Sequence, residues 1–194
     1  MTQFVRNILR VYRKATEQEL REGKAWYETA LDECDIMSRR YGVPVHIVVG
    51  VVAALSPSNR WERNLKDAES MINAYVSGQY MDEVSVATYG AMKAKAWDIL
   101  SRSPDEDEVV SILNGPKIVD FYRCIMGEDT CVIDGHAWCI AHNERRSMQE
   151  VPSIGKAARK ELQDAYVRAG KRVGIPAYEV QAITWVAWRR MHNV

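Results

Sequence analysis

Apolar residues recur every three or four positions along almost the whole chain of 194 residues. A repeat of about 3.6 residues is the one that an amphipathic α-helix produces. One such stretch opens with "TEQE" (16–19), which has the form of a capping box, and its apolar face runs through Trp26 and Ala30 to Met37. The turn "YGVP" (41–44) then stops it. The sequence therefore predicts an all-α fold of about nine or ten helices.

Two segments needed a choice between secondary structures. The Val-rich run at 45–52 could form a buried strand by propensity. We expect a helix there, because "AAL" extends the run beyond strand length and no partner strand is visible. The acidic stretch "SPDEDE" (103–108) is expected to be a solvated loop. The other expected helices lie at about 60–76, 88–100, 109–113, 116–126, from 135, 154–171 and 176–192.

Length and composition predict one globular domain over 1–194. Hydrophobic residues make up 47% of the chain and charged residues 27%, as in soluble globular proteins. We expect an N-terminal helical extension (1–42), a core that bears the motifs (43–143) and basic C-terminal helices (144–194). The longest apolar run, "VPVHIVVGVVAAL", is too short to span a bilayer, and no signal peptide opens the chain. These features predict a cytoplasmic protein that does not bind membranes, and we expect a monomer, although the sequence does not specify the oligomeric state.

Charge is balanced overall but unevenly distributed. Residues 1–144 carry 16 Lys and Arg against 22 Asp and Glu, whereas residues 145–194 carry 10 against 4. The basic C-terminal quarter could face phosphates or be an ordinary solvated surface. The four cysteines form no CxxC pair and no zinc-type spacing, so we expect free thiols and no metal.

The stretch "CVIDGHAW" (131–138) places ionisable side chains at the end of an apolar segment. Asp134 is a good N-cap for the helix that follows, and its carboxylate suits the positive end of that helix. His136 could act on a ligand or be a structural histidine. Whether Asp134 is more than a cap depends on the motifs around it.

Several motifs occur in a fixed order along the chain. "LNGPK" (113–117) predicts a helix–turn–helix, and "VIDGH" places Asp134 seventeen residues after Lys117. This order resembles the helix–hairpin–helix DNA N-glycosylases, the superfamily of endonuclease III and 8-oxoguanine glycosylase, where L-P-G-V-G-x-K precedes V-D-x-H by a similar interval. "DGHAWCIA" is similar to the D-x-H-x-W-x-I-A of the oxoguanine branch. Weaker likenesses are found in "YGAMKAKAWDIL", "AALSPSN" and "QAITWVAW".

The resemblance implies that the protein flips a base out of DNA and cleaves its glycosidic bond. Asp134 would stabilise the positive charge that develops on the sugar. Lys117 would attack the sugar as a neutral amine, which burial or the start of a helix would favour, and would add AP-lyase activity; the alternative is an exposed surface lysine. Asn59 would fill the gap or read the partner base. The other residues implied in DNA or substrate binding are Trp61, Lys93, Asn114, Gly115, His136, Trp138 and Gln181.

The chain also departs from the family pattern. The hairpin is two residues shorter and keeps one glycine, and Pro116 removes a backbone donor that could hold a phosphate. The cysteines do not match the iron–sulfur pattern of the endonuclease III branch, so we expect no cofactor. Two alternatives stay open. One is a compact, bacteriophage-type enzyme of the same fold that modifies bases in DNA without cutting the glycosidic bond. The other is a non-catalytic DNA-binding module in which Asp134 is only a cap.

Overall fold

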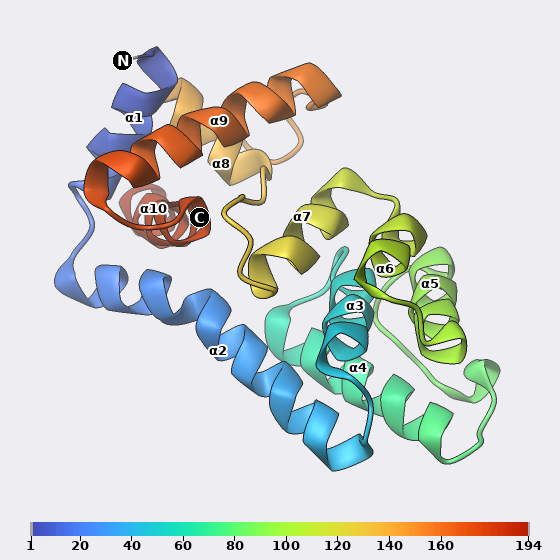
Figure 1. Ribbon diagram of the computed structural model, residues 1–194. Helices are drawn as coiled ribbons and strands as arrows, with labels where there is room; N and C mark the ends of the chain where they lie inside the picture. The colour runs from blue at the N-terminus through green and yellow to red at the C-terminus, as the bar shows by residue number, and fades with distance from the viewer. Residues whose placement is uncertain (1, 194) are drawn as a thin grey trace. The chain divides into compact units, whose positions relative to one another are not determined.

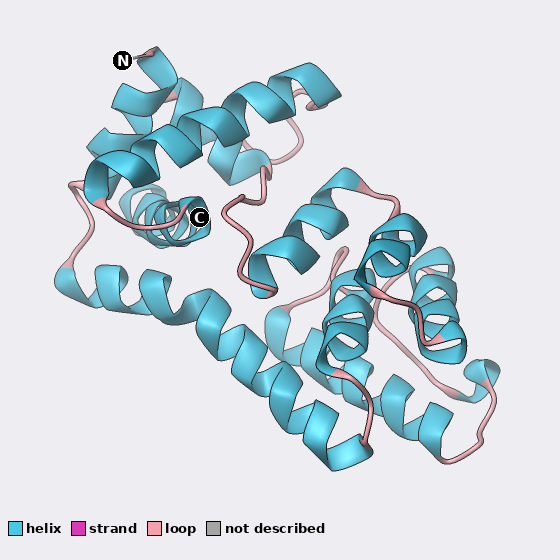
Figure 2. Cartoon of the chain, viewed as in Figure 1, coloured by secondary structure: helices cyan, strands magenta, loops and turns pink. Residues whose placement is uncertain are grey.

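A computed structural model describes residues 2–193, and this part of the chain is helical with no β-strand (Figures 1 and 2). The all-α prediction of nine or ten helices is confirmed. The ten α-helices and one short 3-10 helix are α1 (Gln3–Tyr12), α2 (Glu17–Tyr41), α3 (Val45–Leu55), α4 (Trp61–Val76), η1 (Met81–Glu83), α5 (Gly90–Arg102), α6 (Glu106–Leu113), α7 (Pro116–Ile125), α8 (Gly135–His142), α9 (Lys156–Val173) and α10 (Ala177–His192). None of the described helices is long and apolar enough to cross a membrane.

Local capping chemistry sets the start of α2 as the sequence predicted. The backbone N–H of Thr16 donates to Glu19 Oε2 at 2.8 Å, and the backbone N–H of Glu19 donates to Thr16 Oγ1 at 3.2 Å. This reciprocal pair is a capping box, which satisfies two backbone donors that helix geometry leaves without partners.

The acidic stretch at 103–108 is a loop only in its first half, so that prediction is wrong for the second half. Asp105 is the N-cap of α6 and accepts a hydrogen bond from the backbone N–H of Glu108 at 2.9 Å. Glu106 and Glu108 lie in the first turn of α6. Carboxylates at a helix N-terminus interact favourably with the helix dipole, which explains why an acidic run begins a helix here.

The chain divides into two compact units. Unit 1 consists of Met1–Thr29 with Gly127–Val194, and unit 2 of Ala30–Met126. The boundary at Thr29 falls within α2, and the second boundary follows α7. The subdivisions expected at 42/43 and 143/144 therefore do not coincide with those of the structure.

Unit 2 is organised around α3, which packs against α4, α5, α6 and α7. Every residue of 47–55 is buried, so α3 is apolar on all sides and is covered by its neighbours. A side chain at Gly50 would place Cβ 2.8 Å from Val109 Cγ1 of α6, so the helices approach closely there. The ambiguous Val-rich run is thus a helix, as predicted.

Unit 1 is formed by α1, α8, α9 and α10, which pack on one another, together with the first half of α2. Its two chain segments share one core, and the buried Asn7 Nδ2 donates to the carbonyl of Ala141 at 2.7 Å. The α2 helix meets α10 at Gly23, where a Cβ would lie 2.6 Å from Ile183 Cα. Only glycine allows this backbone-to-backbone approach.

Candidate functional site

The predicted helix–turn–helix is present in unit 2. Helix α6 ends at Asn114, whose φ of 48° is left-handed, and Gly115 is the N-cap of α7, with Pro116 as its first residue. Two residues therefore join two helices, and proline at the first position suits a helix start. Lys117 is exposed in the first turn of α7 and makes no hydrogen bond or ion pair within residues 2–193. The exposed surface lysine that the sequence analysis left as the alternative is therefore what the structure shows at this position.

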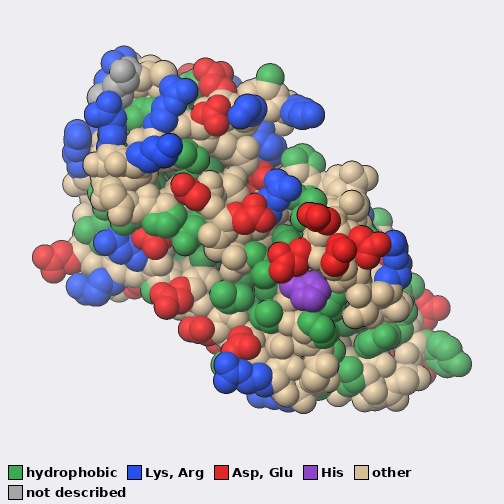
Figure 3. Space-filling view, viewed as in Figure 1, with side chains coloured by type: hydrophobic (Ala, Val, Ile, Leu, Met, Phe, Trp, Pro, Cys, Tyr) green, Lys and Arg blue, Asp and Glu red, His purple; other side chains and the backbone are tan. Residues whose placement is uncertain are grey.

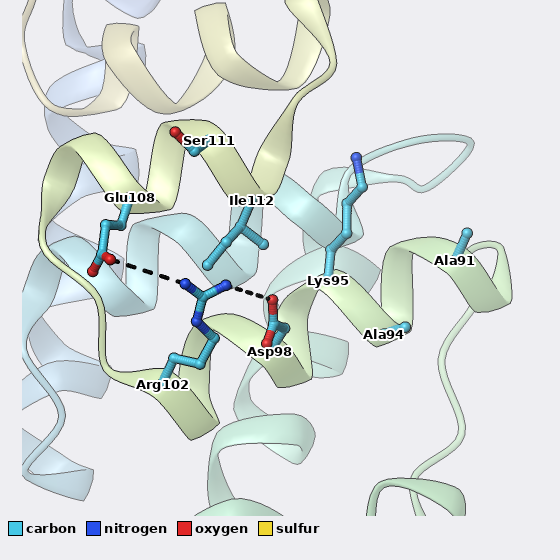
Figure 4. Close-up of a pocket in the computed structure, with 8 residues that line it drawn as sticks. All are labelled: Ala91, Ala94, Lys95, Asp98, Arg102, Glu108, Ser111 and Ile112. Atoms are coloured by element: carbon cyan, nitrogen blue, oxygen red, sulfur yellow. Dashed lines mark hydrogen bonds and ion pairs between the residues drawn. The ribbon is translucent and has the colours of Figure 1, made fainter.

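The lysines of α5 behave differently from one another. The amine of Lys95 donates to the backbone carbonyl of Leu113, the last residue of α6, so this cation holds the hairpin. Lys93 is half-buried and lies two residues before Lys95 on α5, so the two side chains leave different sides of the helix. Between α5 and α6 lies an open hollow, in which Arg102 is placed between Asp98, at 3.3 Å, and Glu108, at 3.9 Å (Figure 4). These two carboxylates neutralise the Arg102 cation.

Asn59 lies on the turn between α3 and α4, and its amide is directed into unit 2. Its Nδ2 donates to the carbonyl of Leu55 at 3.2 Å and to Asp67 Oδ2 at 3.0 Å. Asp67 is 2% exposed and also accepts hydrogen bonds from Arg63 Nε at 2.7 Å and the backbone N–H of Ala87 at 2.8 Å. A gap-filling role for Asn59 would require these bonds to break.

Asp67 is a site residue that the sequence analysis missed. Its carboxylate ties the turn at 56–59 to the loop before α5, and thereby fixes both segments. The signal was present, because Asn64 and Asp67 share helical spacing with the buried Met71. A polar residue on an apolar helix face requires a partner, since burying it without one is costly.

Trp61, which was predicted to bind DNA or substrate, lies at the start of α4 next to another aromatic residue. Trp61 is half-buried, and its ring meets that of Phe121 on α7 edge-on, with centroids 6.3 Å apart. Such a pair stabilises packing beyond the area it buries. The contact joins the start of α4 to α7 within unit 2.

Asp134 lies in unit 1, at the start of α8. The three residues before it, 131–133, are buried, and they carry the chain to the N-cap position as the sequence indicated. Asp134 is half-buried and its Oδ1 accepts a hydrogen bond from the backbone N–H of Ala137 at 2.8 Å. No hydrogen bond or ion pair of Oδ2 is found within residues 2–193. The predicted cap is thus confirmed, and it occupies one of the two carboxylate oxygens.

The chain on either side of Asp134 is held firmly. Arg159 Nη1, from α9, donates to the carbonyl of Ile133 at 3.1 Å. A side chain at Gly135 would place Cβ 2.6 Å from Met148 Sδ, so the following loop covers this glycine. Burial raises the pKa of the Tyr166 hydroxyl, and neighbouring groups that include Asp134 raise it further. The backbone on both sides of Asp134 is therefore held in place by contacts within unit 1.

Two aromatic contacts involve side chains of α8. His136 meets the half-buried Trp185 edge-on at 6.0 Å, and the guanidinium of Arg189 lies 4.6 Å from the centre of the Trp185 ring. Trp138 is 8% exposed and stacks on His142 at 3.9 Å. Trp138 is therefore largely enclosed by its own unit, whereas Trp185 keeps more of its surface accessible.

Gln181, predicted to contact substrate, is buried in α10. Its Oε1 accepts a hydrogen bond from the hydroxyl of Tyr27 on α2 at 3.2 Å. This bond joins α2 to α10 close to the Gly23 contact.

The cysteines are free and buried, and burial raises the pKa of the Cys34 thiol to about 12. Burial likewise raises the pKa of Cys139, so neither thiol is a ready nucleophile. Within residues 2–193, no three His, Cys, Asp or Glu side chains gather in a way that could hold a metal ion.

One protein family matches almost the entire chain. Residues 1–192 match the family described as "Family of unknown function (DUF7178)". The chain belongs to this family. No curated protein and no solved structure matched in the corresponding comparisons. The family description states no activity, substrate or partner.

Proposed function

We propose that the protein is a DNA N-glycosylase and that Asp134 is its catalytic carboxylate. The observation that carries the proposal is that the two carboxylate oxygens of Asp134 differ in their hydrogen bonding. Oδ1 caps α8, while Oδ2 has no partner in the described chain. A carboxylate with one oxygen fixed and the other available can face a developing positive charge without being reoriented. The motif order from Lys117 to Asp134 supports the same function.

The reaction would be hydrolysis at the sugar. The bond between C1′ and the base nitrogen breaks, and its electrons leave with the base, which takes up a proton. A water oxygen bonds to C1′ and gives up one proton, so the products are a free base and an abasic sugar. Positive charge builds on C1′ and the ring oxygen in the transition state, and the Asp134 carboxylate would stabilise that charge. The proposal rests on Asp134 alone, and a contribution from Lys117 would add a lyase step.

A panel of oligonucleotides with damaged and hypermodified bases tests this function. Wild-type protein is incubated with each strand, and the products are identified by mass spectrometry. We expect one class of strand to lose its base. Asp134→Asn keeps a capping side chain, so it should fold normally and lose about 100-fold or more in turnover.

The other outcomes contradict the proposal in distinct ways. A mass change on a strand with its glycosidic bond intact would identify a base-modifying enzyme. Binding without any product would identify a DNA-binding module. Base release at the wild-type rate by Asp134→Asn would show that another group carries the reaction.

A further inference from the structure

A hollow in unit 1 is lined by cations and closed by the start of a helix. Arg168, Lys171 and Arg172 lie at i, i+3 and i+4 on α9, so they share one face of that helix. The other lining residues are Thr2, the N-cap of α1, and Val5, in the first turn of α1. Thr2 is exposed, and Val5 is 1% exposed and forms an apolar floor. No acidic side chain lines the hollow.

These three cations have no carboxylate partner within residues 2–193. Other cations of unit 1 do have one: Arg190 lies 2.6 Å from Glu19, and Arg146 lies 2.6 Å from Glu144. Asp164 is one turn before Arg168 and could pair with it, but Asp164 is paired with Lys160 at 3.5 Å. Positive charge is therefore left uncompensated at this hollow.

Helix dipoles account for only part of this arrangement. Lys171 and Arg172 lie in the last turn of α9, where cations are favourable. The same side chains line a hollow with the start of α1, which carries partial positive charge and has no acidic residue in its first turn. The Thr2 hydroxyl accepts a hydrogen bond from the Val5 N–H there at 3.5 Å. Arg168, Lys171 and Arg172 are exposed, so water screens their mutual repulsion; a bound anion would interact favourably with all three and with the start of α1.

We propose that this hollow is a binding site for a phosphate group, which can be that of a nucleotide or of a nucleic-acid backbone. Guanidinium groups bind phosphate oxygens in bidentate fashion, and N–H groups at a helix start are natural anion ligands. Figure 3 shows Lys and Arg side chains gathered over α1 and α9. Arg159, beside Asp134, is about 20 Å from Arg172 along α9, as calculated from the helical rise. The site is thus separate from the proposed catalytic carboxylate, and it does not depend on the glycosylase function.

The test is a titration of the ¹⁵N-labelled full chain with inorganic phosphate, with chloride used to hold ionic strength constant. We expect saturable shifts of the amide signals of Gln3, Phe4 and Val5 and of the Nε–H signals of Arg168 and Arg172. The triple variant Arg168→Gln, Lys171→Gln, Arg172→Gln should lose them. The matched control is Arg21→Gln, Arg39→Gln, Arg146→Gln, which removes the same charge from cations that already have carboxylate partners and leaves the Lys160–Asp164 pair intact. It should keep the shifts.

Three results would overturn the site: no saturable shift with phosphate, shifts that persist in the triple variant, or equal loss in the control variant. Further titrations with a nucleoside monophosphate and with a single-stranded oligonucleotide distinguish the two sources of the phosphate. If the source is a nucleic-acid backbone, the oligonucleotide binds more tightly than the monophosphate. The triple variant then lowers the slope of log affinity against log salt by about 0.7 per lost contact. If the source is a nucleotide, the monophosphate binds at least as tightly as the strand.

Discussion

Unit 1 and unit 2 contain 97 residues each, yet their charges are opposite. Unit 1 carries 16 Lys and Arg against 12 Asp and Glu, and unit 2 carries 10 against 14. Acidic side chains gather over α6, the first helix of the hairpin (Figure 3). The element that most resembles a DNA-binding hairpin is therefore in the acidic unit, while Asp134 and the cationic hollow are in the basic one. Charge is a better guide than motif to where a polyanion binds, because long-range attraction sums over the whole surface.

A covalent adduct between DNA and Lys117 would contradict this comparison most strongly, because Lys117 lies in the acidic unit 2. If Lys117 attacks the sugar, borohydride should trap the protein on product DNA, and Lys117→Ala should lose the adduct completely. The reason to expect this is the place of Lys117 in the first turn of α7, seventeen residues before Asp134. Electrophoresis of the trapped complex is the measurement, with Lys93→Ala as a control that keeps the adduct. An adduct that survives Lys117→Ala and maps to another amine would refute the hairpin alignment; base release without an adduct would remove only the lyase activity.

A pair of glycine substitutions compares how tightly the two units are packed. In unit 1, Gly23→Ala pushes Cβ against the backbone of Ile183, which cannot move without shifting α10. We expect it to lower the free energy of unfolding by about 3 kcal/mol. In unit 2, Gly50→Ala meets the side chain of Val109, which can change position, and alanine favours the helix. Its cost should be about 1 kcal/mol. Urea unfolding measures the loss of stability of both variants. Equal losses would show that the backbone of α10 moves to accept the new Cβ as easily as the Val109 side chain does.

Removal of Asp67 tests whether unit 2 depends on a single buried carboxylate. Asp67→Ala removes one of the two acceptors of the Asn59 amide and the acceptor of the Ala87 N–H, so we expect a loss of about 2 kcal/mol in stability. The matched control is Asp98→Ala, because Asp98 is an exposed carboxylate paired with Arg102 and should cost about 0.5 kcal/mol. Thermal unfolding of the two variants gives the comparison. Similar losses of stability in the two variants would mean that the hydrogen bonds of Asp67 do not hold these loops in place.

The smallest expected effect is a pH dependence in unit 1. The hydrogen bond from Arg190 lowers the pKa of Glu19, and the capping-box bonds with Thr16 lower it further. A lowered pKa in the folded state means that this stabilisation is present above the unfolded value of about 4.3 and is lost as the pH falls below it. Glu19→Gln should therefore cost about 1 kcal/mol at neutral pH and almost nothing at low pH. The exposed Glu17→Gln is the control, and a cost for Glu19→Gln that did not change with pH would contradict the assignment.

Local signals in the sequence predicted much of this fold. The capping box at Thr16 and the N-cap at Asp134 need only residues three positions apart, and both were confirmed by hydrogen bonds. The second half of the stretch 103–108 was assigned to a loop because its charge was given more weight than helix-start chemistry. Composition alone does not separate an acidic loop from an acidic first turn.

Contacts between distant parts of the chain could not be predicted in this way. The bond from Ala87 to Asp67 spans twenty residues, and Gly23 meets Ile183 from the far end of unit 1. Asn59 was predicted to contact DNA from its local motif, but the direction of its amide depends on Asp67 in the next helix. The sequence therefore predicted that Asp134 and Lys117 lie at the starts of helices. It could not predict which predicted site residues would instead be held by hydrogen bonds inside their own unit, as Asn59 is.

The discontinuity of unit 1 has a consequence for how the protein is made. Unit 2 is a single stretch, 30–126, so all of its segments have been synthesised before the last helices of unit 1 exist. Unit 1 cannot close its core until α8, α9 and α10 have left the ribosome, since buried bonds such as that from Asn7 to Ala141 join its first helix to these late segments. These contacts join residues that are far apart in the sequence, so they can form only after the late segments have been synthesised. During synthesis the apolar face of α1 therefore remains uncovered while unit 2 folds, and this interval is when the nascent chain is most exposed to aggregation and most in need of a chaperone.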